Sequence, residues 1–192
     1  LLESLTEVAK EYAPGDPLEE STAIGPKVSA AQRDRSMRYI QDAKDAGATV
    51  LTGGDAPDDH SLSDGHFILP TVITDIDHDH SAVQEEIFGP VLEVFSWSDY
   101  EEMIELANDV EYGLAGGVLT SDISDAQRAA KDLEAGTVWV NQYNDFPQGM
   151  PVGGYKNSGM GRERAMETIK AYTQTKRIDI SEEKLSSYTD VL

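Results

Sequence analysis

The stretch VLEVFSWSDYEEMIELANDVEYGLAGGVLTSDISDAQRAAKDLEAGTVWVN, residues 91–141, decides the fold class. Its three short apolar runs predict buried strands, and the two segments between them have the apolar spacing of amphipathic helices. Ser98 and Ser124, each followed three residues later by Glu or Gln, predict capping boxes, and Gly136 predicts the end of the second helix. This order predicts a βαβαβ unit with parallel strands, so the expected class is α/β.

The third strand of this unit ends at Asn141 and runs into a glycine-rich loop over residues 142–161. Ligands of parallel sheets bind beyond the carboxyl ends of the strands, so the sequence predicts a site in this region. The loop also carries an apolar stretch from Phe146 to Pro151. That stretch either covers the core or forms the wall of an apolar substrate channel.

The rest of the chain alternates between the two kinds of element. Helices are expected over residues 1–12, 30–46 and 162–172, and strands over 49–54, 66–76 and 175–180. Ser29 is expected to cap the second helix and Gly47 to follow its end, with Met37, Ile40 and Ala43 pointing inward. Pro70 favours an edge strand or a bulge.

The charge of the chain limits its partners. There are 15 basic and 36 acidic side chains, for a net charge of −21. Such a field indicates that neither nucleic acid nor an anionic membrane is a partner. It is typical of a protein kept soluble at high ionic strength, so a halophilic source is our hypothesis. Residues 151–192, with 7 basic and 6 acidic groups, are unlike the rest and are expected to pack on something or to face an anion.

The chain contains no cysteine, which excludes disulfides and thiol nucleophiles within it. No apolar run is long enough for a transmembrane helix. The helical pattern begins at Leu1, which suggests a chain that starts inside an element and is part of a longer protein.

Three other kinds of site are suggested by short motifs: a phosphate loop, a calcium loop and a hydrolase active site. GGYKNSGMGRE (153–163) lacks the Lys and Ser/Thr of a phosphate loop, so positive-φ turns before a helix are expected there. In DIDHDHSAVQEE (75–86), oxygen-bearing side chains fall at calcium-loop positions, but His80 stands where glycine is required, so calcium is kept as a minor alternative. The four histidines have no serine in a nucleophile elbow, which argues against a hydrolase.

Six ordered motifs together resemble the C-terminal part of the catalytic domain in the aldehyde dehydrogenase superfamily. They are STAIGPKVSAAQ (21–32), DGHFILPTVI (64–73), EEIFGPV (85–91), ANDVEYGLAGGVLT (107–120), AGTVWVNQY (135–143) and PVGGYKNSGMGRE (151–163). The tail AYTQTKRIDI (171–180) continues the resemblance, which covers about residues 1–180. It implies that 1–170 is a partial catalytic domain, 171–181 an oligomerisation strand and 182–192 a polar tail.

The resemblance implies oxidation of aldehydes to acids with NAD or NADP. A cysteine thiolate attacks the carbonyl, hydride passes to the nicotinamide, and a glutamate-activated water releases the acyl enzyme. The thiol and the Rossmann half are expected outside this chain, which alone is expected to be inactive. A truncated, non-catalytic assembly module is the alternative.

The resemblance also assigns residues to the cofactor. Glu86 resembles the clamp on the nicotinamide-ribose hydroxyls, and Phe88 the aromatic that braces the nicotinamide ring. Both are expected on one side of the extended chain, with Glu85 as a structural neighbour. Gln32 and Arg35 match a helix that reaches the cofactor's ribose.

On the substrate side, Asn141 resembles the residue that shapes the active-site floor. The residues that fall where the family lines its aldehyde tunnel are Gln142, Tyr143, Phe146 and Val152. The MPVGGYK form of the loop is closest to the betaine- and amino-aldehyde branch. Members of that branch can hold a potassium ion on backbone carbonyls of this loop, which would place Lys156 and Gly159 near it. The tail TQTKRIDI resembles the strand through which subunits of the family associate, so a homo-oligomer (a dimer or tetramer) is expected. The expected location is cytoplasmic.

Overall fold

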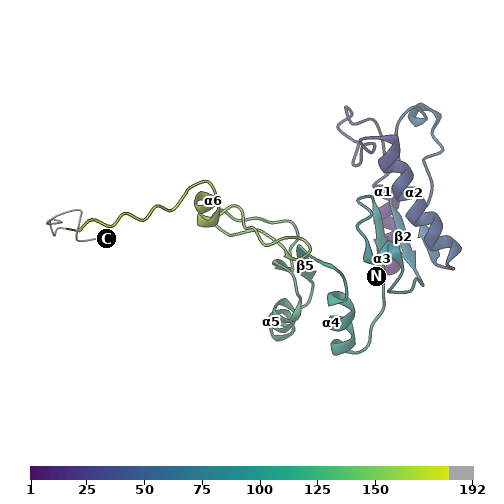
Figure 1. The fold of residues 1–192 in the computed structure, drawn as a ribbon. Helices are drawn as coiled ribbons and strands as arrows, with labels where there is room; N and C mark the ends of the chain where they lie inside the picture. The colour runs from purple at the N-terminus through teal and green to yellow at the C-terminus, as the bar shows by residue number, and fades with distance from the viewer. Residues whose placement is uncertain (182–192) are drawn as a thin grey trace. The chain divides into compact units, whose positions relative to one another are not determined.

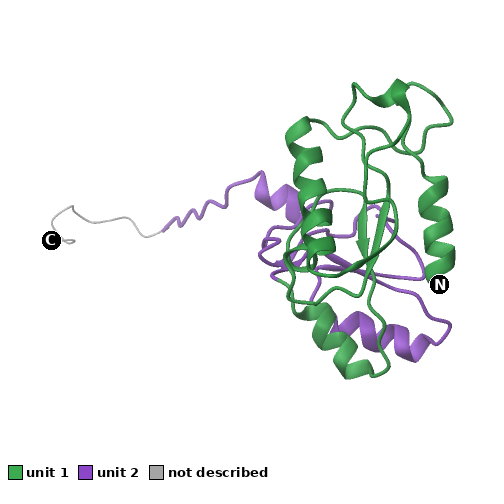
Figure 2. Ribbon diagram, turned by 90° about the vertical axis from the view of Figure 1, so that its right-hand side faces the viewer, with its two compact units in different colours: residues 1–110 green, residues 111–192 purple. Residues whose placement is uncertain are grey.

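The computed structural model describes residues 1–181 and divides the chain into two compact units, Leu1–Val110 and Glu111–Leu192. Figure 1 labels the elements along the chain, and Figure 2 colours the two units separately. The expected polar tail, 182–192, lies outside the described residues. The expected boundary at residue 170, between a partial catalytic domain and an oligomerisation strand, stays a prediction.

The first unit is built on a three-stranded sheet in the order β1-β2-β3, with β1 at Thr49–Thr52, β2 at Thr71–Thr74 and β3 at Val91–Glu93. The central strand β2 pairs antiparallel with β1 and parallel with β3. All four β2 residues are buried. Of the two expectations at Pro70, the edge strand is wrong, because the proline lies just before the central strand, where its missing N–H costs no ladder bond. The other expectation was a bulge, and the pairing of β1 with β2 is irregular between Val50 and Thr52.

Helices α1 (Leu2–Glu11) and α2 (Ala30–Asp45) belong to the same unit. The Ser29 side chain accepts from the Gln32 backbone amide, and Gly47 adopts a φ of +96°, so both predicted caps are confirmed. Ile40 and Ala43 are fully buried, whereas Met37 is only half-buried. The core cluster brings α2 onto the sheet and contains Ala43, Ile73, Ile76, Ala82 and Ile87.

Three short helical elements complete the unit: η1 (His60–Leu62), α3 (Ser81–Gln84) and α4 (Tyr100–Asn108). The cap of α4 is Asp99, whose carboxylate accepts from the Glu102 amide at 3.0 Å. The predicted cap at Ser98 is therefore wrong by one residue. Aspartate caps as well as serine does and adds a charge that favours the positive helix N-terminus.

The second unit contains the parallel pair β5 (Ala115–Val118) and β6 (Thr137–Val140), with α5 (Ile123–Asp132) between them in sequence. The pair runs in register from Ala115↔Thr137 to Val118↔Val140. This strand–helix–strand segment was expected from the sequence. The α5 cap is Asp122 rather than Ser124, and the helix ends at Asp132, before Gly136.

The first strand of the predicted βαβαβ unit has a different partner from the one expected. β3 pairs with β2, which precedes the quoted stretch, and the described residues form three separate sheets. The third is an antiparallel pair of β4 (Tyr112–Gly113) and β7 (Tyr155–Lys156). One parallel sheet that joins β3 to β5 and β6 stays a prediction.

The C-terminal part of the second unit has fewer residues in helices and strands than expected. Helix α6 covers Met166–Ala171, where residues 162–172 were predicted. Residues 174–181 lead away from α6 as an extended trace without strand pairing inside the described chain (Figure 1). Among residues 1–181, no helix has both the length and the apolar character to cross a membrane.

Candidate functional site

The loop of residues 85–90 carries the predicted cofactor residues of the first unit. Ile87 is 8% exposed and belongs to the core cluster, whereas Glu86 and Phe88 are exposed. Glu86 and Phe88 are thus the exposed neighbours of a buried residue. Their common direction towards a cofactor stays a prediction.

Helix α2 holds the start of this loop. The Arg35 guanidinium donates to the carbonyl oxygen of Glu86 at 2.9 Å and to the Tyr39 hydroxyl at 3.3 Å. The Tyr39 hydroxyl in turn donates to the Glu85 carboxylate. The contact with Tyr39, and to a smaller extent the carboxylates of Glu85 and Glu86, raise the pKa of Arg35. Glu85 is thus a structural neighbour, as expected.

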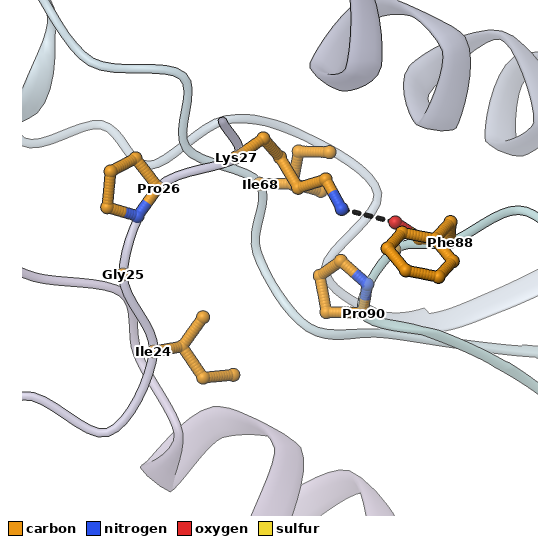
Figure 3. A pocket seen from close by; sticks show the side chains of 8 residues that line it. Ile24, Gly25, Pro26, Lys27, Ile68, Phe88 and Pro90 are labelled. Atoms are coloured by element: carbon orange, nitrogen blue, oxygen red, sulfur yellow. Dashed lines mark hydrogen bonds between the residues drawn. The ribbon is translucent and has the colours of Figure 1, made fainter. Parts of the chain in front are cut away.

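The centre of the loop has an unusual backbone. Phe88 adopts a φ of +56°, a left-handed conformation that is unfavourable for a residue with a bulky side chain. The Lys27 ammonium donates to the Phe88 carbonyl oxygen and lies 5.6 Å from the centre of its ring. Figure 3 shows this contact at one side of a pocket of about 430 Å³, which is otherwise lined by Ile24, Gly25, Pro26, Ile68, Gly89 and Pro90.

The end of the loop packs closely on α2. A Cβ atom at Gly89 would lie 2.7 Å from the Ser36 hydroxyl, so a larger residue there would have to displace Ser36. Ser36 is fully buried and donates to the Gln32 carbonyl oxygen at 3.2 Å. The side chain of Gln32 is exposed. Of the four predicted cofactor residues, Gln32 and Arg35 therefore lie on α2, and Glu86 and Phe88 lie in the loop that packs against this helix.

In the second unit, Asn141 directly follows β6 and has a φ of +53°. Its side-chain oxygen accepts from the Thr120 amide at 2.9 Å, and its side-chain nitrogen donates to the Thr120 carbonyl oxygen at 2.8 Å. Asparagine tolerates left-handed backbone better than most residues. The side chain thus ties the carboxyl end of β6 to the chain that leaves β5, at the edge where a site was predicted.

Aromatic residues gather beyond this end of β6. Trp139 is buried and meets the rings of Tyr143 and Phe146 edge-on, at centroid distances of 5.2 and 5.3 Å. Its indole N–H donates to the Asp145 carbonyl oxygen at 2.8 Å. Arg164 lies 4.5 Å from the centre of the Phe146 ring. Of the predicted tunnel residues, Phe146 is thus half-covered, while Tyr143 and Gln142 are exposed.

The glycine-rich loop returns along itself. Val152 and Glu163 exchange backbone hydrogen bonds of 3.0 and 2.8 Å. One nitrogen of Arg162 donates to the carbonyl oxygens of Gly154, Met160 and Gly161, at 3.0, 3.2 and 2.9 Å. This guanidinium therefore fixes the loop through its backbone.

The residues predicted to hold potassium lie in a turn of this loop. Lys156 and Gly159 both have positive φ, and the Gly159 amide donates to the Lys156 carbonyl oxygen at 3.2 Å. The Lys156 ammonium pairs with the Glu134 carboxylate at 2.8 Å. One acceptor position of the Lys156 carbonyl is therefore used inside the turn, and potassium binding there stays a prediction.

The calcium-loop interpretation of residues 75–86 finds no support. Its second half forms α3, and the His80 side chain caps that helix by accepting from the Ala82 amide at 3.1 Å. Among residues 1–181, no three His, Asp or Glu side chains come together as a metal site.

Sequence reasoning missed the three cations that shape these loops, namely Lys27, Arg162 and Arg164. Lys27 and Arg162 lie inside motifs quoted for the resemblance, GPKVSAAQ and SGMGRE. A basic residue in an acidic chain is a weak signal by itself, because its partners here are backbone carbonyls and ring faces that no sequence pattern identifies.

Comparison with known proteins gives a consistent result. Residues 1–178 match the sequence profile of the aldehyde dehydrogenase family. A betaine aldehyde dehydrogenase of Brucella anthropi is 44% identical over 186 residues, which are 97% of this chain and 38% of that protein. The chain therefore spans little more than a third of the length of this curated relative.

Solved structures agree with the sequence matches. The NAD⁺ complex of betaine aldehyde dehydrogenase from Staphylococcus aureus has a TM-score of 0.90 and 40% identity, covering 97% of this chain and 37% of that one. The NAD⁺ complex of an aldehyde dehydrogenase from Bacillus cereus has a TM-score of 0.88 and 41% identity, covering 95% of this chain and 36% of that one.

Proposed function

The chain belongs to the aldehyde dehydrogenase family, and we propose that it supplies the nicotinamide-side contacts and part of the substrate wall of an NAD(P)-dependent enzyme that oxidises an aldehyde to a carboxylic acid. The observation that carries this proposal is the alternation along one loop of exposed Glu86, buried Ile87 and exposed Phe88. The NAD⁺ complexes of similar proteins support it.

The loop suits a nicotinamide riboside. The exposed carboxylate of Glu86 can accept hydrogen bonds from two sugar hydroxyls, and the Phe88 ring, 68% exposed, can lie against a planar ring. When bound, the cofactor supplies the hydride acceptor. The part of this chain is to hold the ring and the ribose in place, which lowers the barrier through orientation rather than through proton transfer.

We propose betaine aldehyde or a related aldehyde as the substrate. The 44% identity to a betaine aldehyde dehydrogenase supports this choice. A quaternary ammonium group is attracted by aromatic faces, and Tyr143, 81% exposed, offers one at the predicted tunnel wall. The Phe146 face is occupied by Arg164, so in this arrangement Tyr143 is the ring available to a cationic substrate.

The nucleophile of this reaction is not in the chain, because the chain contains no cysteine. We therefore propose that the 192-residue chain by itself does not oxidise aldehydes. The test is to measure NADH and NADPH formation by the complete gene product with betaine aldehyde and with an uncharged aliphatic aldehyde of similar size. The 192-residue chain is assayed in parallel, and turnover by that chain alone would contradict the proposal.

The role of Glu86 is tested in the same assay. Replacing Glu86 by Gln removes the charge and half of the acceptor capacity, so we expect hydride transfer to slow by about tenfold. Glu7→Gln, which removes an exposed carboxylate on α1, is the matched control. Equal rates for wild type and Glu86→Gln would exclude the carboxylate as the ribose clamp.

We further propose that the predicted oligomerisation strand, which begins at residue 174 because α6 extends to Ala171, joins subunits by β-pairing. The segment has exposed Ile178 and Ile180, 68% and 84% accessible, and no strand partner within residues 1–181. An extended segment with exposed apolar side chains can add as a strand to the sheet edge of another chain. Deleting the residues after Ala171 should lower the molar mass measured by light scattering to that of a smaller assembly; an unchanged mass would rule out this role.

A further inference from the structure

We infer that Lys27 is a positioning residue for the proposed cofactor loop, and that it acts by holding the Phe88 peptide in its left-handed conformation. This inference rests on the proposed function for its kinetic consequence only. Its structural content is the contact between the Lys27 ammonium and the carbonyl oxygen of Phe88, two segments 61 residues apart in sequence.

The backbone at Phe88 needs such a partner. A left-handed φ of +56° in a non-glycine residue is less favourable than the ordinary regions, because the Cβ atom crowds the backbone carbonyl oxygen. A hydrogen bond from a charged donor is stronger than one between neutral groups and can offset this cost. The conformation persists because the Phe88 carbonyl meets the ammonium, and the ring then lies within cation–π range of the same charge, at 5.6 Å.

The neighbouring residues leave the Phe88 peptide as the adjustable part of the loop. Before it, Ile87 is buried in the core and the Glu86 carbonyl is held by Arg35. After it, Gly89 packs against Ser36, and the Pro90 carbonyl accepts from the Thr71 amide at 2.8 Å. Loss of the ammonium would therefore change the direction of the Phe88 ring while both ends of the loop stayed in place.

Lys27 is itself held firmly enough to act as an anchor. Its backbone amide donates to the His66 carbonyl oxygen at 2.9 Å, in the segment that leads into β2. It lies between Pro26 and the helix cap at Ser29, which restrict the backbone on both sides. Its side chain is half-buried along the pocket of Figure 3, with the ammonium directed at the Phe88 carbonyl oxygen.

The structural test uses the 192-residue chain labelled with 4-fluorophenylalanine, since the chain has only 4 phenylalanines. Phe88→Leu assigns the Phe88 signal in the fluorine spectrum. In Lys27→Met, which keeps an apolar stem but removes the donor, we expect the Phe88 signal to move towards the shift of the unfolded chain while the other signals stay. Lys27→Arg should retain the wild-type position, and Lys10→Met, an exposed lysine on α1, is the charge control. An unmoved Phe88 signal in Lys27→Met would overturn the inference.

The kinetic test uses the complete gene product with NAD. We expect Lys27→Met to lower kcat by about tenfold with less than about a threefold change in the KM for NAD, because a misdirected ring brace harms orientation more than binding. Lys27→Arg should restore most of kcat. A rise in KM with kcat unchanged would contradict the positioning role. If wild type shows no NAD-dependent turnover, the proposed function fails, and the fluorine spectra still decide the role of Lys27.

Discussion

The side-chain amide of Asn141 forms two hydrogen bonds with the backbone of Thr120, accepting at 2.9 Å and donating at 2.8 Å. The amide thereby acts as one further rung of the parallel ladder, past the last paired residues Val118 and Val140. Asn141 thereby fixes the chain that leaves β5 to the chain that leaves β6, at the place where the sequence predicts the floor of the site.

Replacing Asn141 separates the contribution of its side-chain hydrogen bonds to stability from that of its left-handed backbone. Asn141→Gly removes both side-chain bonds but keeps the left-handed backbone at no cost, so we expect unfolding to become easier by about 1 kcal/mol. Asn141→Ala also introduces the backbone penalty and should cost about 2 kcal/mol. Urea denaturation followed by circular dichroism measures both. Equal losses for the two variants would show that backbone conformation plays no part.

The cap of α5 offers a test with a control two residues away. The Asp122 carboxylate accepts from the amides of Ser124 and Asp125 at 2.7 and 3.2 Å. Asp122→Ala should therefore destabilise the chain by about 1 kcal/mol. Ser124→Ala, at the position that the sequence pattern selected, should change stability by less than about 0.5 kcal/mol. The reverse order in thermal melts would restore Ser124 as the cap.

The two misplaced caps show what the sequence could and could not specify. The apolar spacing in residues 91–141 was enough to predict which segments are strands and which are helices. The caps were harder to predict, because Asp and Ser both cap helices well. At the start of each helix an Asp and a Ser lie within two residues of each other: Ser98 and Asp99, and Asp122 and Ser124. Local sequence cannot choose between such neighbours; packing of the first turn does. The same holds for β3, whose partner β2 precedes the regular segment and was not part of the predicted unit.

The site shows a similar division. Glu86 and Phe88 were predicted on one side because alternation in an extended segment is a local property. The left-handed Phe88 and its Lys27 contact depend on a residue 61 positions away, which periodicity does not reveal. The family resemblance identified the candidate site residues, whereas the basic residues that hold the loops could be recognised only from their contacts in the folded structure.

Glu93 on β3 predicts a pH dependence of stability. It is half-buried, its Oε1 has no hydrogen-bond partner in the described structure, and burial raises its pKa above the ordinary 4.5. A carboxyl group with a raised folded pKa binds its proton more tightly in the folded state. Its stabilising protonated form is fully present below the ordinary pKa, and that stability is lost as the pH rises through the folded pKa.

We therefore expect Glu93→Gln to stabilise the chain at neutral pH by about 1 kcal/mol, because it removes an unpaired buried charge. The gain should vanish when the pH falls below the ordinary value of 4.5. Glu105→Gln removes an exposed carboxylate from the middle of α4 and serves as the control for net charge. A stabilisation of the same size in Glu105→Gln would assign the effect to overall charge and not to burial.

The net charge of −21 leads to the last prediction. Residues 1–150 hold 30 acidic against 8 basic side chains, so the surface of this part repels itself in dilute buffer. Raising the salt from about 0.1 M to 1 M shortens the Debye length from about 10 Å to about 3 Å, which removes most of this repulsion. We expect the thermal midpoint to rise by roughly 10 °C over that range. Sucrose at equal osmolality is excluded from the protein surface but does not screen charge, so it should produce a smaller rise. Full stability in dilute buffer with no gain from potassium chloride would disprove adaptation to high salt, whereas a gain matched by sucrose would assign the effect to solute exclusion.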